Sequence, residues 1–161
     1  MKSNINKLIL IPVILLICIN SYGQAKGKHK TVKKTDACQV CDVKMVISTE
    51  DSIKANSLSK SQLYCFLKGF NSICVRNDEY SARSNMVLYY VAKGYPEEFV
   101  DVLLNHKELK TNYIYSELSN LLIINDMEEI MQKYKPQQGD DQKKKMIKAN
   151  ISQSLKKSLT K

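Results

Sequence analysis

Apolar residues recur at helical spacing through the middle of the chain, from Ser59 to Asn105. The pattern i, i+3, i+4, i+7 is that of an amphipathic helix with one buried face. A first segment has this pattern at Leu63, Phe66, Leu67 and Phe70. A second has Tyr80, Val87 and Val91, widened by Met86, Leu88 and Tyr90, and a third has Phe99, Val102 and Leu103. We therefore expect three consecutive helices that form the folding core.

Polar and turn-forming residues mark the ends of these helices. Ser59 and Gln62 have the spacing of a capping box, which predicts the start of the first helix. Gly94 stands where a left-handed C-terminal cap is expected, and Pro96 stands where a following helix would begin. The pair predicts a sharp break between the second and third helices.

The segment before the core is harder to assign. Residues 37–47 contain Val40, Val43, Val46 and Ile47, which predict a short strand or an extended cover over the helices. Ser48 and Asp51 then have capping-box spacing, although Asp is a weaker partner than Glu at that position. We expect a short helix around residues 50–57.

The segment after the core predicts further helices. One is expected around residues 112–123, with a short strand at Leu121–Ile124 as an alternative, and another runs from Asp126 to Tyr134. The tail has a narrow apolar stripe at strict i+4 spacing, formed by Ile147, Ile151, Leu155 and Leu159. This stripe fits docking on the domain, on a membrane surface or on a partner.

The overall pattern predicts an all-α fold. Five glycines and three prolines in 161 residues are too few for an all-β protein, which needs turn residues every 8–12 positions or so. We expect a five- or six-helix bundle or a short HEAT-like helical stack, joined by disulfides.

Residues 1–23 have the pattern of a secretory signal peptide. Lys2 and Lys7 precede an apolar stretch, and small or polar residues follow it. The junction of Gly23 with Gln24 resembles signal peptides of some Gram-negative bacteria. An uncleaved anchor and lipidation at Cys18 are alternatives, but Ile17 is bulky for a lipobox. We expect an exported protein, periplasmic or secreted.

Charge divides the remaining chain into three parts. Loss of Lys2 and Lys7 lowers the formal net charge from +9 to +7. Residues 24–34 carry five lysines and no acid, and residues 136–161 carry seven lysines and two aspartates. Residues 35–135 carry eleven basic and fourteen acidic groups. The division predicts a basic disordered arm at 24–36, a helical domain at 37–136, and a basic linker with an amphipathic helix at 137–161. Weak contact of the tails with an anionic envelope surface is possible on charge alone, and no nucleic-acid partner is expected.

Four cysteines remain after the leader, namely Cys38, Cys41, Cys65 and Cys74. An even number in an exported chain predicts two disulfides. Four cysteines allow three connectivities. We favour crossed pairing, which joins the first two cysteines to the last two, over a local Cys38–Cys41 bond. A thiol-redox or zinc site that uses Cys38 and Cys41 is the alternative. No strand precedes this pair, and the spacing of the other two is unusual for zinc.

The sequence does not point to an enzyme. His29 lies in the basic arm, and His106 follows a helix end, where a cation suits the helix dipole. The adjacent acids fall at or near expected helix starts, and no phosphate-binding loop or catalytic motif is present in the sequence. We expect no catalytic residue, no metal ligand and no cofactor.

Tyrosines gather in the central helices, at Tyr89, Tyr90, Tyr95, Tyr113 and Tyr115. Tyrosine is enriched at interfaces because it buries a large area at low entropic cost. These side chains are either an interaction surface or the edge of the core.

One part of the chain resembles small exported bacterial all-helical proteins of unknown function. The resemblance covers Asn77–Ser81, Ser84 and Asn85, Leu88, Pro96 with Glu97, and Phe99. It implies a fold and carries no functional residue. Some periplasmic immunity proteins share the type, being small, all-α and disulfide-linked. We therefore expect a non-enzymatic protein-interaction module with a protein partner, and an inhibitor or immunity-type protein is one concrete version. A peripheral envelope binder that uses its basic tails is a further alternative.

Overall fold

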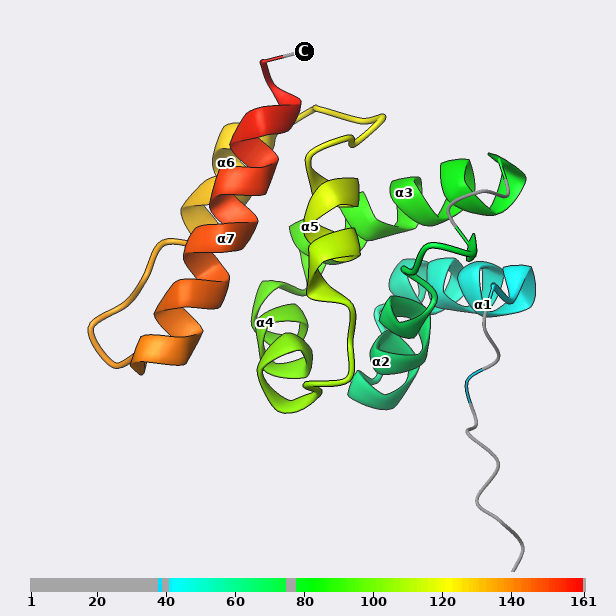
Figure 1. The fold of residues 1–161 in the computed structure, drawn as a ribbon, viewed down its shortest axis with the longest axis horizontal. Coiled ribbons are helices and arrows are strands. Elements are labelled where there is room, and N and C mark those ends of the chain that lie inside the picture. The colour runs from blue at the N-terminus through cyan, green and yellow to red at the C-terminus, as the bar shows by residue number, and fades with distance from the viewer. Residues whose placement is uncertain (1–37, 39–40, 75–77, 161) are drawn as a thin grey trace, which may run out of the picture. The chain divides into compact units, whose positions relative to one another are not determined.

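The described residues, which are 38, 41–74 and 78–160 of the computed structural model, form seven α-helices and no strand (Figure 1). In chain order the helices are α1 (Val43–Lys54), α2 (Lys60–Lys68), α3 (Asp78–Gly94), α4 (Pro96–Asn105), α5 (Thr111–Leu118), α6 (Met127–Lys133) and α7 (Gln142–Ser158). The predicted all-α class is thus confirmed. The expected leader at 1–23 and the basic arm at 24–36 lie outside the described residues.

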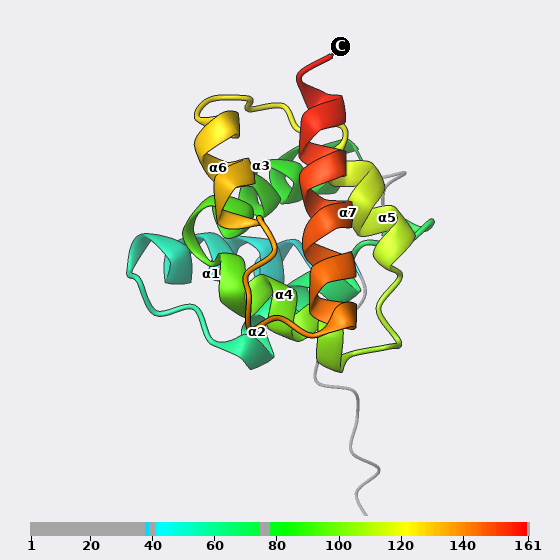
Figure 2. The same cartoon turned by 90° about the vertical axis from the view of Figure 1, so that its left-hand side faces the viewer.

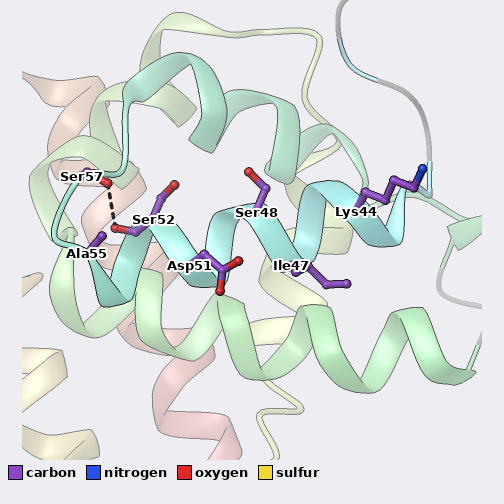
Figure 3. Close-up of a pocket in the computed structure, with 7 residues that line it drawn as sticks. All are labelled: Lys44, Ile47, Ser48, Asp51, Ser52, Ala55 and Ser57. Carbon is purple, nitrogen blue, oxygen red and sulfur yellow. Dashed lines mark hydrogen bonds between the residues drawn. The ribbon is translucent and has the colours of Figure 1, made fainter.

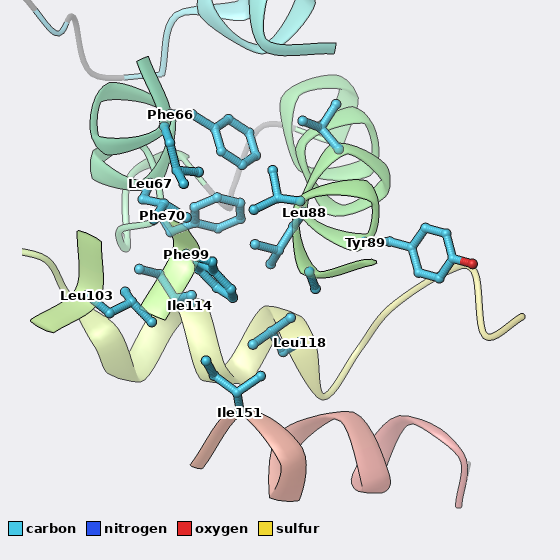
Figure 4. Packing of buried hydrophobic residues seen from close by; sticks show 14 of the residues in the cluster. Phe66, Leu67, Phe70, Leu88, Tyr89, Phe99, Leu103, Ile114, Leu118 and Ile151 are labelled. Atoms are coloured by element: carbon cyan, nitrogen blue, oxygen red, sulfur yellow. The ribbon is translucent and has the colours of Figure 1, made fainter. Parts of the chain in front are cut away.

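The core is built from the three helices that the apolar pattern predicted. Phe66 of α2 and Phe70, just after that helix, meet edge to face, with ring centroids 5.2 Å apart, and Leu88 of α3 and Phe99 of α4 lie around them (Figure 4). All four side chains are no more than 1% exposed. Burial of a large apolar side chain contributes roughly 1.5–3 kcal/mol, so this group dominates the local stability.

The C-terminal helix α7 is part of this core. It contacts α4, α5 and α6, and Figure 2 shows it between α5 and α6. Ile151 and Leu155 are fully buried, whereas Leu159 is 41% exposed. Three of the four residues of the tail stripe therefore dock on the domain. In a solenoid each repeat contacts only its neighbours. Here α7 packs on α4, which lies three helices earlier in the chain, so the fold is a bundle.

Two disulfides join the N-terminal segment to the core. Cys38 pairs with Cys65 of α2, and Cys41 pairs with Cys74 at the corner that follows α2. This is the crossed connectivity that we favoured, and the local Cys38–Cys41 bond is not formed. Because both links cross more than 25 residues of chain (27 and 33), they fix the start of α1 against α2.

The expectation for residues 37–47 is wrong from residue 43 onward, because Val43–Ile47 are helical. Asp42 caps α1, and its carboxylate accepts a hydrogen bond of 2.9 Å from the Lys44 amide. The capping box proposed at Ser48 lies inside this helix. The β-branched residues favour a strand locally, but burial of Val46 against the core outweighs that preference.

Two other predicted boundaries are corrected. Gly94 is the last residue of α3, and no glycine in the described part of the chain has a positive φ. Pro96, at the first position of α4, is sufficient to separate the two helices. The helix expected at 112–123 ends at Leu118, and residues 121–124 form neither helix nor strand.

Candidate protein-binding face

The four cysteines that the sequence singled out are all consumed in the two disulfides. A disulfide sulfur is not a thiolate, so a redox or zinc function of Cys38 and Cys41 would first require reduction of both bonds. Cys38 is 8% exposed and Cys74 is fully buried, which limits access to the bonds. Their arrangement is that of structural crosslinks.

The five candidate tyrosines do not form one surface. Tyr89 is 3% exposed, and its hydroxyl donates a 2.9 Å hydrogen bond to the Asn125 carbonyl. Tyr95, Tyr113 and Tyr115 are half-buried, and burial raises the pKa of Tyr115. Only Tyr90, at 38% exposed, is an open aromatic side chain on the surface of α3. The interpretation as core edge thus describes most of the set.

Tyr90 belongs to an outward-facing row on α3. The row consists of Glu79, Ala82, Arg83, Met86, Tyr90 and Lys93, spaced three or four residues apart. Such spacing places side chains on one side of a helix. Along it, Ala82 and Tyr90 are exposed and Met86, between them, is half-buried.

Two walls flank the row. On one side is α1, with Glu50, Ile53 and Lys54, and on the other is the segment that follows α5, with Leu122 and Ile123. Two hollows of about 420 and 360 Å3 lie along these walls, and Met86 lines both. Leu122 and Ile124 are 68% and 51% exposed. We call the row and its two walls the α3 face.

An ion pair network joins α1 to α3 beside the hollows. The Glu50 carboxylate accepts hydrogen bonds from Lys54 Nζ at 2.6 Å and from Arg83 Nη2 at 2.9 Å. The bond from Lys54, followed by that from Arg83, holds the pKa of Glu50 below its usual range. Because the Glu50 side chain is 12% exposed while those of Lys54 and Arg83 are 67% and 40% exposed, the network presents positive charge to solvent.

The second wall is held by the buried amide of Asn85. Its Nδ2 donates to the carbonyls of Glu117 and Asn120 at 3.3 and 3.2 Å, and its Oδ1 accepts from the Leu122 amide at 2.9 Å. These bonds join the turn that follows α5 to α3, and the Glu117 carbonyl also accepts a 2.9 Å hydrogen bond from the Asn120 amide. The bond to the Leu122 amide holds Leu122 beside α3.

A separate shallow hollow of about 430 Å3 lies along the outer side of α1 (Figure 3). Ser48 and Ser52 face it, and both hydroxyls bond to the Gln62 side chain at 3.0 Å. A serine nucleophile needs an adjacent base, and none of the residues lining this hollow is a histidine. Figure 3 also shows Ile47 and Asp51 pointing to the side of α1 on which α3 lies.

His106 occupies the expected position after α4. It is the C-cap of that helix, stacks on Tyr64 with ring centroids 4.1 Å apart, and lies 3.1 Å from the Glu108 carboxylate. A backbone hydrogen bond of Glu108 and the bond to His106 hold the pKa of this carboxyl below its usual range. The contacts attach the α4–α5 loop to α2.

A buried lysine lies where α7 meets α4. The Lys148 side chain is 1% exposed, and its Nζ lies 3.0 Å from Asp140 and 3.2 Å from Glu97. Lys144 pairs with Glu97 at 2.7 Å and, as the main cause, lowers the pKa of that carboxyl. Asp140 also accepts a bond from the Gln137 amide at 2.8 Å, which lowers its pKa. A buried charge is costly unless it is paired. We therefore interpret this network as structural, because it joins the linker before α7 and α7 itself to α4.

Within the part of the chain that the structure describes, no group of three or more His, Cys, Asp or Glu side chains could hold a metal ion. Among the same residues, no helix is both long enough and apolar enough to cross a membrane.

Sequence reasoning missed most of the α3 face. It named Tyr90 as an interface residue, and it placed Met86 only on a helix face expected to be buried. Ala82, Met86 and Tyr90 have helical spacing and were readable as a short second stripe on this helix. The walls had no local signal, because Ile53 and Leu122 reach the face from distant parts of the chain.

Comparison of the chain with protein-family models, with curated proteins and with solved structures finds no match.

Proposed function

We propose that this protein is a non-enzymatic exported module that binds another protein through the α3 face. The observation that carries the proposal is the row of α3 between two walls, with Ala82, Tyr90 and Leu122 exposed and Met86 lining both hollows. Contiguous exposed apolar surface with a charged rim is typical of protein interaction sites. The hollows beside Met86 suit side chains of a partner helix.

An inhibitor or immunity-type role is one concrete form of this proposal. Such a protein acts by occupying the surface of its target and needs no reacting group of its own. Two disulfides suit a compartment that is oxidising, where such inhibitors would meet exported targets. The rigid bundle supports tight binding, because little ordering entropy is lost on association.

Affinity purification from cell-envelope extract tests the proposal. The wild-type chain and Met146→Lys, which changes an exposed methionine of α7, are expected to retain the same partner. Met86→Lys is expected to lose it, because the substitution places an unpaired charge in the centre of the face. A partner retained equally by all three chains would refute the α3 face as the site. If the captured partner is a hydrolase, loss of its activity on binding would support the inhibitor form.

A further inference from the structure

The outward row of α3 has the spacing of a helix–helix seam. Glu79, Arg83, Met86, Tyr90 and Lys93 follow one another at intervals of four, three, four and three residues. In coiled coils this alternation marks the side of a helix that packs against another helix. On α3 the row is partly open to solvent beside α1: Tyr90 is 38% exposed and the Arg83 side chain is 40% exposed.

The row is also self-complementary about Met86. Glu79 lies seven residues before Met86, and Lys93 lies seven residues after it. Ala82 and Tyr90 stand four residues on either side. An antiparallel copy of α3 centred on Met86 would therefore place Glu79 against Lys93 and the small Ala82 against the large Tyr90.

We propose that the α3 face docks a second copy of this chain, with a two-fold axis through the pair of Met86 side chains. A two-fold interface uses the same patch on both subunits, so a contact between residues 79 and 93 occurs twice. Arg83 of each copy then lies beside the Tyr90 ring of the other, a geometry that favours a cation–π contact. Leu122, at 68% exposed, extends the apolar contact beyond the helix pair.

The charges of the face are compatible with this occupant. Lys93 Nζ bonds to Asp126 of its own chain at 2.5 Å, and an ammonium group has three donors, so a further donor can bind Glu79 of the second copy. Glu79 is exposed at the start of α3. A uniformly acidic or basic partner would leave one end of the row opposite a like charge, which disfavours binding.

This inference rests on the proposed use of the α3 face for docking, and it names the occupant of that face in the purified protein. The test is the mass of the full chain, expressed with its own leader and purified with its disulfides intact, measured by light scattering across a concentration series. The wild-type chain and Met146→Lys are expected to have the mass of two chains. Met86→Lys is expected to raise the dissociation constant at least about tenfold, because two like charges would meet on the axis. An unchanged circular dichroism spectrum confirms that each variant is folded.

Crosslinking tests the antiparallel register. Met86→Cys is expected to form a disulfide with itself on oxidation, because the two-fold axis brings the two sites together. Lys93→Cys alone is expected to remain uncrosslinked, and to crosslink when mixed with Glu79→Cys. A wild-type chain that stays monomeric at high concentration, or a dimer unaffected by Met86→Lys, would overturn the inference. A monomer that still loses its envelope partner on Met86→Lys would leave the proposed function standing with a foreign partner on the face.

Discussion

Gly69 shows how a single residue is fixed by a distant one. A Cβ at this position would lie 1.9 Å from the Tyr80 hydroxyl, and Tyr80 is 3% exposed. The backbone of Gly69 has an ordinary helical φ of −69°, so the requirement for glycine comes from packing and not from backbone conformation. Burial also raises the pKa of Tyr80 to about 12.

Two glycine substitutions with opposite expected signs test this reading. Gly69→Ala should destabilise the protein by about 1–3 kcal/mol, since the ring of Tyr80 must move within a packed core. Gly94→Ala should stabilise it by about 0.5–1 kcal/mol, because no atom lies within 4 Å of the new methyl group and alanine favours helix. Urea unfolding of both variants measures the difference. Adding Tyr80→Phe to Gly69→Ala should recover part of the lost stability. Equal effects of Gly69→Ala and Gly94→Ala would contradict this explanation by packing.

At the scale of elements, the contact of α1 with α3 depends on the ionisation of Glu50. The ionised carboxylate binds Lys54 and Arg83 in the folded protein, and this lowers the pKa of Glu50 from 4.5. A lowered pKa means that the folded state favours the ionised form. The resulting stability is present above about pH 4.5 and is lost as the pH falls through the folded-state pKa.

The pH dependence of Glu50→Gln checks this sign. At neutral pH the variant should be less stable than the wild type by about 1 kcal/mol, a modest value because Lys54 and Arg83 are partly exposed and screened. The difference should shrink toward zero as the pH falls below 4.5 and through the folded-state pKa, because the wild-type carboxyl then protonates. Asp51→Asn, at the neighbouring exposed acid of α1, is the control and should stay within about 0.5 kcal/mol of wild type. A constant difference from neutral to acidic pH would argue against the ion pairs.

At the scale of the whole molecule, the disulfides set the stability of the bundle. Each closes a loop of about 30 residues (sequence separations of 27 and 33), and the chain-entropy model predicts a contribution of about 3–4 kcal/mol for a loop of this size. The native state of a small domain is stable by only about 5–15 kcal/mol, so loss of one bond is a large fraction of the total.

Paired substitutions separate the two crosslinks. Cys38→Ser with Cys65→Ser, and Cys41→Ser with Cys74→Ser, should each lower the free energy of unfolding by about 2–5 kcal/mol. Chemical denaturation of the two double variants measures the losses, and peptide mapping without reductant should recover fragments joined in the crossed pairs. A reductant that leaves the wild-type unfolding midpoint unchanged would show that the bonds do not stabilise the fold.

More of the fold than of the α3 face could be predicted from the sequence. The helical period of Leu63–Phe70 and Phe99–Leu103 predicted their burial, and Pro96 predicted the start of α4. The strand expectation at Val43–Ile47 was wrong because β-branched residues carry a local preference that burial overrides. The helix expected to 123 was too long, and Asn85, which bonds to the turn that follows α5, lies on another helix, so this contact left no local signal.

The sequence by itself determined the all-α class, the core of the central helices and the presence of two disulfides. These follow from local period and from the even count of cysteines, which need no knowledge of distant contacts. Only the tertiary structure decided which cysteines pair, that α7 docks on the bundle, and that Tyr89 is buried while Tyr90 is open. It also decided that Ile53 and Leu122 lie on either side of Met86. Such groupings depend on long-range packing, because residues far apart in the chain become neighbours only when the helices pack together.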